Sequence, residues 1–116
     1  MRSVESFEKI FLYPKAVDMR KQINGLAHIV ESSALKLFSP SLFLFSNRHR
    51  KLVKALYWAD TGFCLWMMKL EENRFPWPKS SDKHLILSPE QFNWLIKGVD
   101  FSKIKPHQTL QYERFS

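Results

Sequence analysis

The sequence predicts a single α+β domain in which two helices pack on an antiparallel sheet. Apolar residues recur at helical spacing near residue 20 and again near residue 90, whereas between 41 and about 70 their period falls to two. The 116 residues form one domain by length, 1–116, with enough apolar sequence to bury a core. We therefore expect a three-stranded antiparallel meander with short edge strands, packed with two helices.

A first strand and a first helix are expected in the N-terminal third. The apolar run IFLY at 10–13 is followed by a proline and indicates a strand. In DMRKQINGLAHIVESS the apolar spacing is helical, and Asp18 is of a type that caps the free N–H groups of a first turn. A helix over 18–32 is predicted. Gly25 inside it costs about 1 kcal/mol relative to Ala. A close approach by another backbone would explain this glycine, and so would simple tolerance of the cost.

The meander is predicted over 41–70. SLFLF, KLVKALYW and FCLWMMKL are aromatic-rich runs of strand length, separated by the turn-forming stretches SNRHR and ADTG. The central strand of the sheet is expected at 52–58. Neither of its faces is cleanly polar, so both faces should be at least partly covered. We also expect Cys64 to be inaccessible to solvent and the indoles of Trp58 and Trp66 to be mostly buried.

The C-terminal third predicts one more strand and one more helix. NRFPWPKSSD contains two prolines and cannot continue a central strand, and KHLIL at 83–87 indicates a short edge strand. SPEQ has the serine, proline and glutamine of a helix start with a capping box, and KG is placed to end the helix. A helix over 89–97 follows. The basic tail from about residue 101 is expected to be irregular.

Composition suggests an intracellular protein with a polyanionic partner. The 18 Lys and Arg residues exceed the 11 Asp and Glu residues, for a net charge of +7. The single cysteine excludes an intrachain disulfide and fits a reducing cytoplasm. We find no signal peptide and no apolar run that approaches the roughly 20 residues needed to cross a bilayer. We expect a cytoplasmic protein that does not associate with a membrane.

Two groups of basic residues are candidate phosphate contacts. The first gathers bases of one sign at a predicted hairpin turn and the strand behind it: Arg48, His49, Arg50, Lys51 and Lys54. The second is Arg20 and Lys21 in the first turn of the predicted helix. Cations there are unfavourable for the helix dipole, and a phosphate bound by the free N–H groups of the same N-terminus would turn this mismatch into a site. For the first group, the alternative is an ordinary solvated turn that collects charges. For the second group, the alternative is that Asp18 already compensates the helix dipole.

Aromatic side chains could stack on unpaired bases, although aromatics at period two in a sheet more often form the core. The best candidate for stacking is Trp77, because it lies between two prolines and could be presented at the surface.

An enzymatic function is not expected, and no catalytic residue, cofactor or metal site is assigned. The acids Asp18, Asp60, Glu71, Glu72 and Asp82 do not form a recognisable two-metal motif. The histidines show no HxH or HExxH pairing, and the chain has only three glycines and no Gly-rich phosphate loop.

The ordered series VDMRKQINGLAHIV, LFLFSNRHRKLVKALYW and TGFCLWMMKLEENRFPWP, followed by a C-terminal helix, resembles a known family. This is the family of the small accessory protein TnpB, or Orf2 protein, of transposable elements of the insertion-sequence-66 class. The resemblance covers about 10–112. The residues that carry it are Asp18, Met19, Arg20, Lys21, Gly25, Leu26, Phe45, Asn47, Arg48, Lys54, Leu56, Tyr57, Trp58, Gly62, Phe63, Leu70, Glu71, Phe75, Trp77 and Pro78.

The resemblance implies a non-catalytic helper in DNA transposition that works beside a separate transposase. From it and from the basic groups, we expect binding to DNA or to a transposase–DNA complex. The alternative is an adaptor that binds the transposase without touching DNA. A clustered basic surface would favour the first, and an exposed apolar patch the second.

Overall fold

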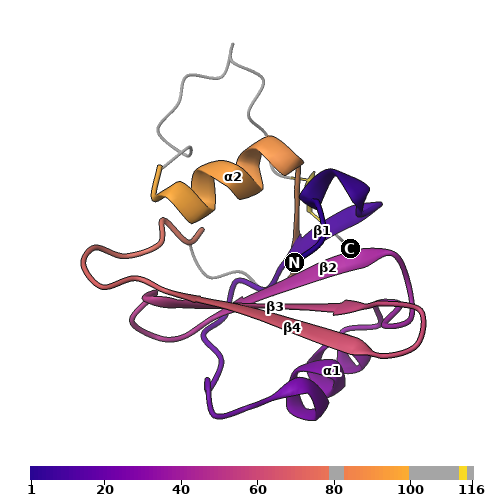
Figure 1. The fold of residues 1–116 in the computed structure, drawn as a ribbon. Helices are drawn as coiled ribbons and strands as arrows, with labels where there is room; N and C mark the ends of the chain where they lie inside the picture. Colours follow the sequence, from indigo (N-terminus) through magenta and orange to yellow (C-terminus); the bar gives the residue numbers. More distant parts are fainter. Residues whose placement is uncertain (79–82, 100–112, 115–116) are drawn as a thin grey trace.

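The structure is a computed structural model that describes residues 1–78, 83–99 and 113–114. A mixed sheet separates two helices, one on each face (Figure 1). The elements in chain order are a 3-10 turn at Val4–Ser6, β1 at Lys9–Leu12, α1 at Ile23–Ser32, β2 at Ser41–Ser46, β3 at Leu52–Trp58, β4 at Phe63–Lys69, β5 at Leu85–Leu87, α2 at Pro89–Lys97 and β6 at Glu113–Arg114. The α+β class predicted from the sequence is confirmed.

The predicted meander is present, but the sheet around it is mixed. β2, β3 and β4 pair antiparallel in sequence order, as expected. β1, however, pairs with β2 in parallel, from Lys9 opposite Ser41 to Leu12 opposite Leu44. A parallel pair needs a crossover connection, and the chain makes one through α1. A wholly antiparallel sheet was therefore the wrong expectation.

The six strands are arranged in the order β4-β3-β2-β1-β5-β6. β5 pairs antiparallel with β1 on one side and with the two-residue β6 on the other, so the predicted edge strand at 83–87 is flanked on both sides. β6 lies in the tail that was expected to be irregular, and the rest of that tail lies outside the described residues. The long strand at an edge is β4.

The first helix begins later than predicted. α1 starts at Ile23 with Gln22 before it, and Gln22 makes no side-chain cap. Asp18 instead closes a turn of its own, because its carboxylate accepts a hydrogen bond from the Arg20 backbone N–H at 2.9 Å. At Gly25 a β-carbon would lie 3.1 Å from the Lys21 side chain, so the close neighbour is that side chain and not another backbone.

The second helix follows the prediction closely. Ser88 and Gln91 form a reciprocal capping box, with the Gln91 N–H donating to Ser88 Oγ at 3.1 Å and the Ser88 N–H to Gln91 Oε1 at 2.8 Å. Gly98 ends the helix at φ 80°, a left-handed conformation that costs glycine little.

Each face of the sheet carries its own core. α2 covers one face, where Phe92 and Leu95 pack with Leu42, Leu44 and residues of the N-terminal segment. α1 covers the other face, where Leu26 and Val30 pack with Phe43 and Phe45. All six residues of β2 are buried. Coverage on both faces explains why β2 and β3 lack a polar face.

The prediction that Cys64 is inaccessible to solvent is wrong. Cys64, Trp58 and Trp66 are all only partly buried. β4 is an edge strand whose residues are half-buried or exposed along its whole length, whereas β3 is buried in its interior.

Candidate nucleic-acid interface

The turn between β2 and β3 is organised by Asn47 and presents basic side chains. Asn47 Oδ1 accepts hydrogen bonds from the backbone N–H groups of Lys51 and Leu52 at 3.0 and 3.2 Å. The Arg50 N–H donates to the Asn47 carbonyl at 3.1 Å, and Arg50 adopts a left-handed φ of 57°. This tight turn leaves Arg48 and His49 exposed and Lys51 partly exposed.

Two neighbouring segments bring further cations to the same end of the sheet. The Val17 N–H donates to the Ser46 carbonyl at 2.9 Å, which places the 14–17 segment beside the turn. The Leu70 N–H donates to the Lys51 carbonyl at 2.8 Å, which places the end of β4 on the other side. We call this surface the basic end, and its members are Lys15, Arg48, His49, Lys51, Lys69 and Arg74. The exposed carboxylates of Glu71 and Glu72 lie in the loop after β4.

Arg50 and Trp77, both predicted to face nucleic acid, instead tie this end of the molecule together. Arg50 Nη2 donates to the Pro14 carbonyl at 2.9 Å, and its guanidinium lies 5.6 Å from the centre of the Trp77 ring. Trp77 is partly buried, and its Nε1–H donates to the Tyr13 carbonyl at 3.0 Å. Burial lowers the pKa of the Arg50 guanidinium from its ordinary value. Both side chains are engaged within the fold, so we leave both out of the basic end.

Lys54 is buried, and its ammonium group is bonded within the fold. Its side chain is in the middle of β3 and is 3% exposed. Nζ donates to the carbonyls of Met19 and Lys21, both at 2.9 Å. The ammonium group holds the segment before α1 against the sheet, which corrects its place among the predicted phosphate contacts.

Arg20 and Lys21 precede α1 and do not lie in its first turn. The Arg20 guanidinium forms an ion pair with Asp18, with Nη2 and Oδ2 2.6 Å apart, and both side chains are well exposed. The hydrogen bond from Arg20 lowers the pKa of the Asp18 carboxyl to about 2. Lys21 is exposed, and the two cations continue the 14–17 segment along the α1 face of the sheet.

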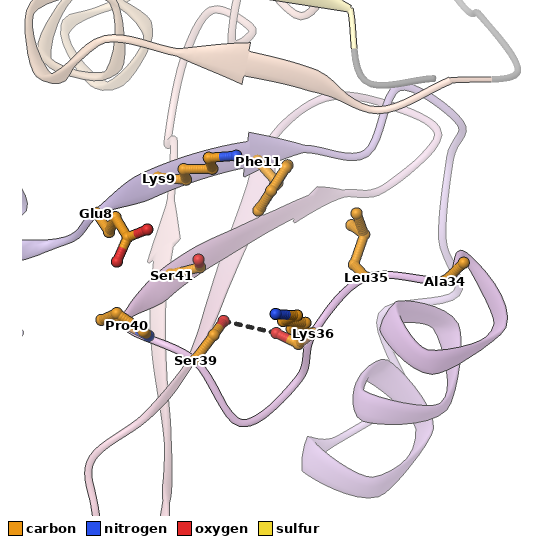
Figure 2. Close-up of a pocket in the computed structure, with 9 residues that line it drawn as sticks. All are labelled: Glu8, Lys9, Phe11, Ala34, Leu35, Lys36, Ser39, Pro40 and Ser41. Atoms are coloured by element: carbon orange, nitrogen blue, oxygen red, sulfur yellow. Dashed lines mark hydrogen bonds between the residues drawn. The ribbon is translucent and has the colours of Figure 1, made fainter.

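A separate cavity of about 260 Å³ lies at the opposite end of β2, where β1 and β2 begin (Figure 2). Its lining residues are Glu8, Lys9, Phe11, Ala34, Leu35, Lys36, Ser39, Pro40 and Ser41. Ser39 donates to the Lys36 carbonyl at 2.6 Å. The lining combines two ammonium groups with the Glu8 carboxylate, so it suits a small polar molecule without a marked preference for anions. No motif in the sequence signals it, and it does not join the basic end.

No metal centre is present among the residues that the structure describes: nowhere do three or more His, Cys, Asp or Glu side chains gather to hold an ion. Asp82, one of the acids considered above, lies outside those residues. Within the same ranges, none of the helices has the length and apolar character needed to span a membrane.

The fold and the basic end define a small α+β protein with a cationic surface and two covered sheet faces. The chain matches the family model described as IS66 Orf2 like protein over residues 8–106. It belongs to this family, which associates it with transposition by elements of the insertion-sequence-66 class.

Two relatives come from Sinorhizobium fredii. The uncharacterized protein y4jC is 31% identical over 98 residues, covering 84% of this chain and 84% of the relative. The uncharacterized protein y4hO is 29% identical over 94 residues, covering 80% and 82%. No solved structure matches this chain.

Proposed function

We propose that this protein is a non-catalytic accessory protein of transposition that binds DNA, alone or with the transposase, through the basic end. The observation that carries the proposal is the convergence of three separate segments, 14–17, 47–51 and 69–74, at one end of the sheet. Exposed cations on a turn reach phosphate oxygens without entering a groove, which gives affinity with little sequence preference.

The proposed site consists of the exposed cations together with the partly exposed Lys51. Arg48, His49 and Lys51 form its centre, with Lys15, Lys69 and Arg74 around them, and Arg20 and Lys21 extend it along the α1 face. Arg50, Lys54 and Trp77 support the backbone that positions these groups.

The test is a salt titration of DNA binding by the double variant Arg48→Ala, Lys51→Ala. Each phosphate that the variant no longer neutralises should reduce the slope of log K against log salt by about 0.9, so the slope should shrink by at most about 1.8. Affinity should fall equally for element-end DNA and unrelated DNA, since phosphate contacts position the protein and do not read the sequence. The thermal melt should hardly change, because exposed charges contribute little to stability.

A matched control is the double variant Lys9→Ala, Lys36→Ala. It removes the same charge from the opposite end of the sheet, beside the cavity. The proposal requires that this control keep the wild-type salt slope. Equal reductions in both variants would indicate a diffuse charge effect. Wild-type binding by the basic-end variant would reject the DNA contact altogether.

The second candidate is an adaptor that binds the transposase of the same element without contacting DNA. The exposed apolar side chains Phe38 and Met67, 63% and 58% exposed, favour it. Binding of the purified transposase in the absence of DNA, unchanged by Arg48→Ala, Lys51→Ala, would support the adaptor over the DNA-binding function.

A further inference from the structure

The outer side of β4 carries backbone groups that no described strand satisfies. The Ala59 N–H donates to the Gly62 carbonyl and the Leu70 N–H to the Lys51 carbonyl, both at 2.8 Å. Because hydrogen-bonded pairs alternate along an antiparallel ladder, the even-numbered residues of β4 bond to β3. The odd-numbered residues therefore direct their N–H and C=O groups outward: Phe63, Leu65, Met67 and Lys69.

Among the residues that the structure describes, this edge has none of the usual features that prevent pairing with another strand. Its register with β3 runs without a bulge from Phe63 to Lys69, and its sequence FCLWMMK contains no proline and a single charge. Natural sheets protect their edges with short strands, charges, prolines or bulges. The opposite edge is protected in this way, because β6 has two residues. An open strand of seven residues favours a partner strand.

We propose that two copies of this chain pair through β4, antiparallel, to form one continuous sheet. With a two-fold axis at Trp66, Leu65 of one copy lies opposite Met67 of the other, and Phe63 lies opposite Lys69. All four outward-facing residues of each copy then bond across the interface. Side chains keep their faces, as in an isologous contact. Cys64, Trp66 and Met68 of the two copies meet on one face and Leu65 and Met67 on the other, with Lys69 opposite Phe63 at each end.

Charge distribution favours a second copy in this orientation. The hairpin end of β4 carries the exposed Asp60 and a cluster of aromatic rings, in which Phe38 lies 4.9 Å from Trp58 and 5.3 Å from Phe63 between ring centres. The other end of β4 carries Lys69 and the basic end. Antiparallel pairing places each Lys69 beside the aromatic cluster of the other copy, where a cation is stabilised by ring faces. It also holds the two basic ends apart, whereas parallel pairing would bring like charges together.

The first experiment measures the mass of the full chain in solution by light scattering and sedimentation equilibrium. The wild type should have twice the mass of one chain. Leu65→Pro should be monomeric, because the Leu65 N–H points outward and its removal breaks no bond to β3. Val99→Ser, which changes a 41% exposed apolar residue far from β4 in sequence, is the matched control and should remain dimeric.

The second experiment tests the register and does not depend on the folding of a proline variant. In the proposed pairing Cys64 lies opposite residue 68 of the second copy in a non-hydrogen-bonded pair, with Cα atoms about 4.5 Å apart. That separation suits a disulfide. Met68→Cys should therefore give a covalent dimer with oxidised glutathione. Within one chain the two thiols would be about 13 Å apart on the strand, too far to bond.

Met67→Cys is the matched control, since residue 67 lies on the opposite face of the sheet from Cys64. It should cross-link at least about tenfold more slowly, because a disulfide needs the two Cβ atoms on the same face. A wild type that stays monomeric at all concentrations, or cross-linking that is equal in the two variants, would overturn the proposal. Neither readout requires DNA. Failure of the dimer proposal would therefore leave the proposed DNA binding untouched, and failure of DNA binding would leave the dimer proposal untouched.

Discussion

At the residue scale, Lys54 and His84 are two buried ionisable side chains, and they differ in their hydrogen bonding. Lys54 is 3% exposed and donates to two backbone carbonyls. His84 is 6% exposed, packs 4.9 Å from the Tyr13 ring, and has no hydrogen-bond partner at Nε2 among the described residues. Burial lowers the pKa of His84 to about 4. Both side chains therefore affect stability more than binding.

Lys54→Met should lower the free energy of unfolding by about 1–3 kcal/mol, because the Met19 and Lys21 carbonyls lose a charged donor. Urea unfolding measures the change. Lys36→Met, at an exposed position outside the sheet and outside both proposed contacts, is the control and should stay within about 0.5 kcal/mol of wild type. A Lys54→Met protein of wild-type stability with a reduced salt slope would show that Lys54 contacts DNA after all.

His84 should make the protein less stable in mild acid. Its folded pKa of about 4 lies below the ordinary 6.5, so below pH 6.5 the unfolded chain takes up a proton that the folded chain does not. Stability from this residue is intact above pH 6.5 and is lost as the pH falls toward 4, by up to about 3 kcal/mol at 1.36 kcal/mol per pH unit.

His84→Leu should remove this part of the pH dependence. Unfolding free energies of both proteins at about pH 7.5 and about pH 4.5 supply the comparison, because these values lie on either side of the interval in which the unfolded histidine titrates. The carboxylates that titrate in the same range are common to both proteins. Parallel decreases in the two proteins would contradict the assignment to His84.

At the scale of elements, the loop after β4 is attached to the turn between β2 and β3. Phe75 is 2% exposed, and its N–H donates to the Arg50 carbonyl at 2.7 Å. The Arg50 side chain joins this loop to the end of β1 through Pro14 and Trp77. Three segments of the basic end therefore depend on one arginine that is itself half-buried.

Arg50→Ala should lower the free energy of unfolding by about 1–2 kcal/mol, because it removes a hydrogen bond to Pro14 and the cation–π interaction with Trp77. Alanine keeps an L-residue at the φ of 57°, so the substitution tests the side chain and not the backbone strain. Thermal melts should show a clear decrease for Arg50→Ala and almost none for Arg48→Ala. The reverse order would place Arg50 at the surface and Arg48 in the structural support.

At the scale of the whole molecule, β1 lies inside the sheet and bonds to a strand on each side. Hydrogen exchange should therefore protect the amides of Ile10, Phe11 and Leu12 as strongly as those of β2, up to the free energy of global unfolding. In an edge strand alternate amides would face solvent. An alternating pattern of fast and slow exchange along β1, measured by NMR, would contradict its position between two strands.

Local patterns predicted the elements well where the pattern and the cap agreed. α2 begins at its capping box and ends at Gly98 as expected, and the three strands of the meander lie where the period of two indicated. α1 was less well predicted, because Asp18 has the residue type of a cap but bonds to Arg20 within its own turn.

The position of the basic turn was predicted, but not the segments that surround it. The sequence cluster around residue 48 does lie on an exposed turn, but the presence of Lys15 and Lys69 beside it depends on contacts between distant segments. Burial of Arg50, Lys54 and Trp77 could not be predicted from their neighbours in sequence, since their hydrogen-bond partners are 33 to 64 residues away along the chain.

The sequence by itself determined the α+β class, the capped second helix, the meander and the excess of positive charge. These features depend on residue type and on spacing over a few positions, where backbone preference and alternation act directly. Only the tertiary structure decided that β1 runs parallel to β2, that three of the predicted contact residues support the fold, and that β4 is at the edge of the sheet among the described strands. Strand order and burial depend on which distant segments meet, and that is decided by the packing of both sheet faces at once.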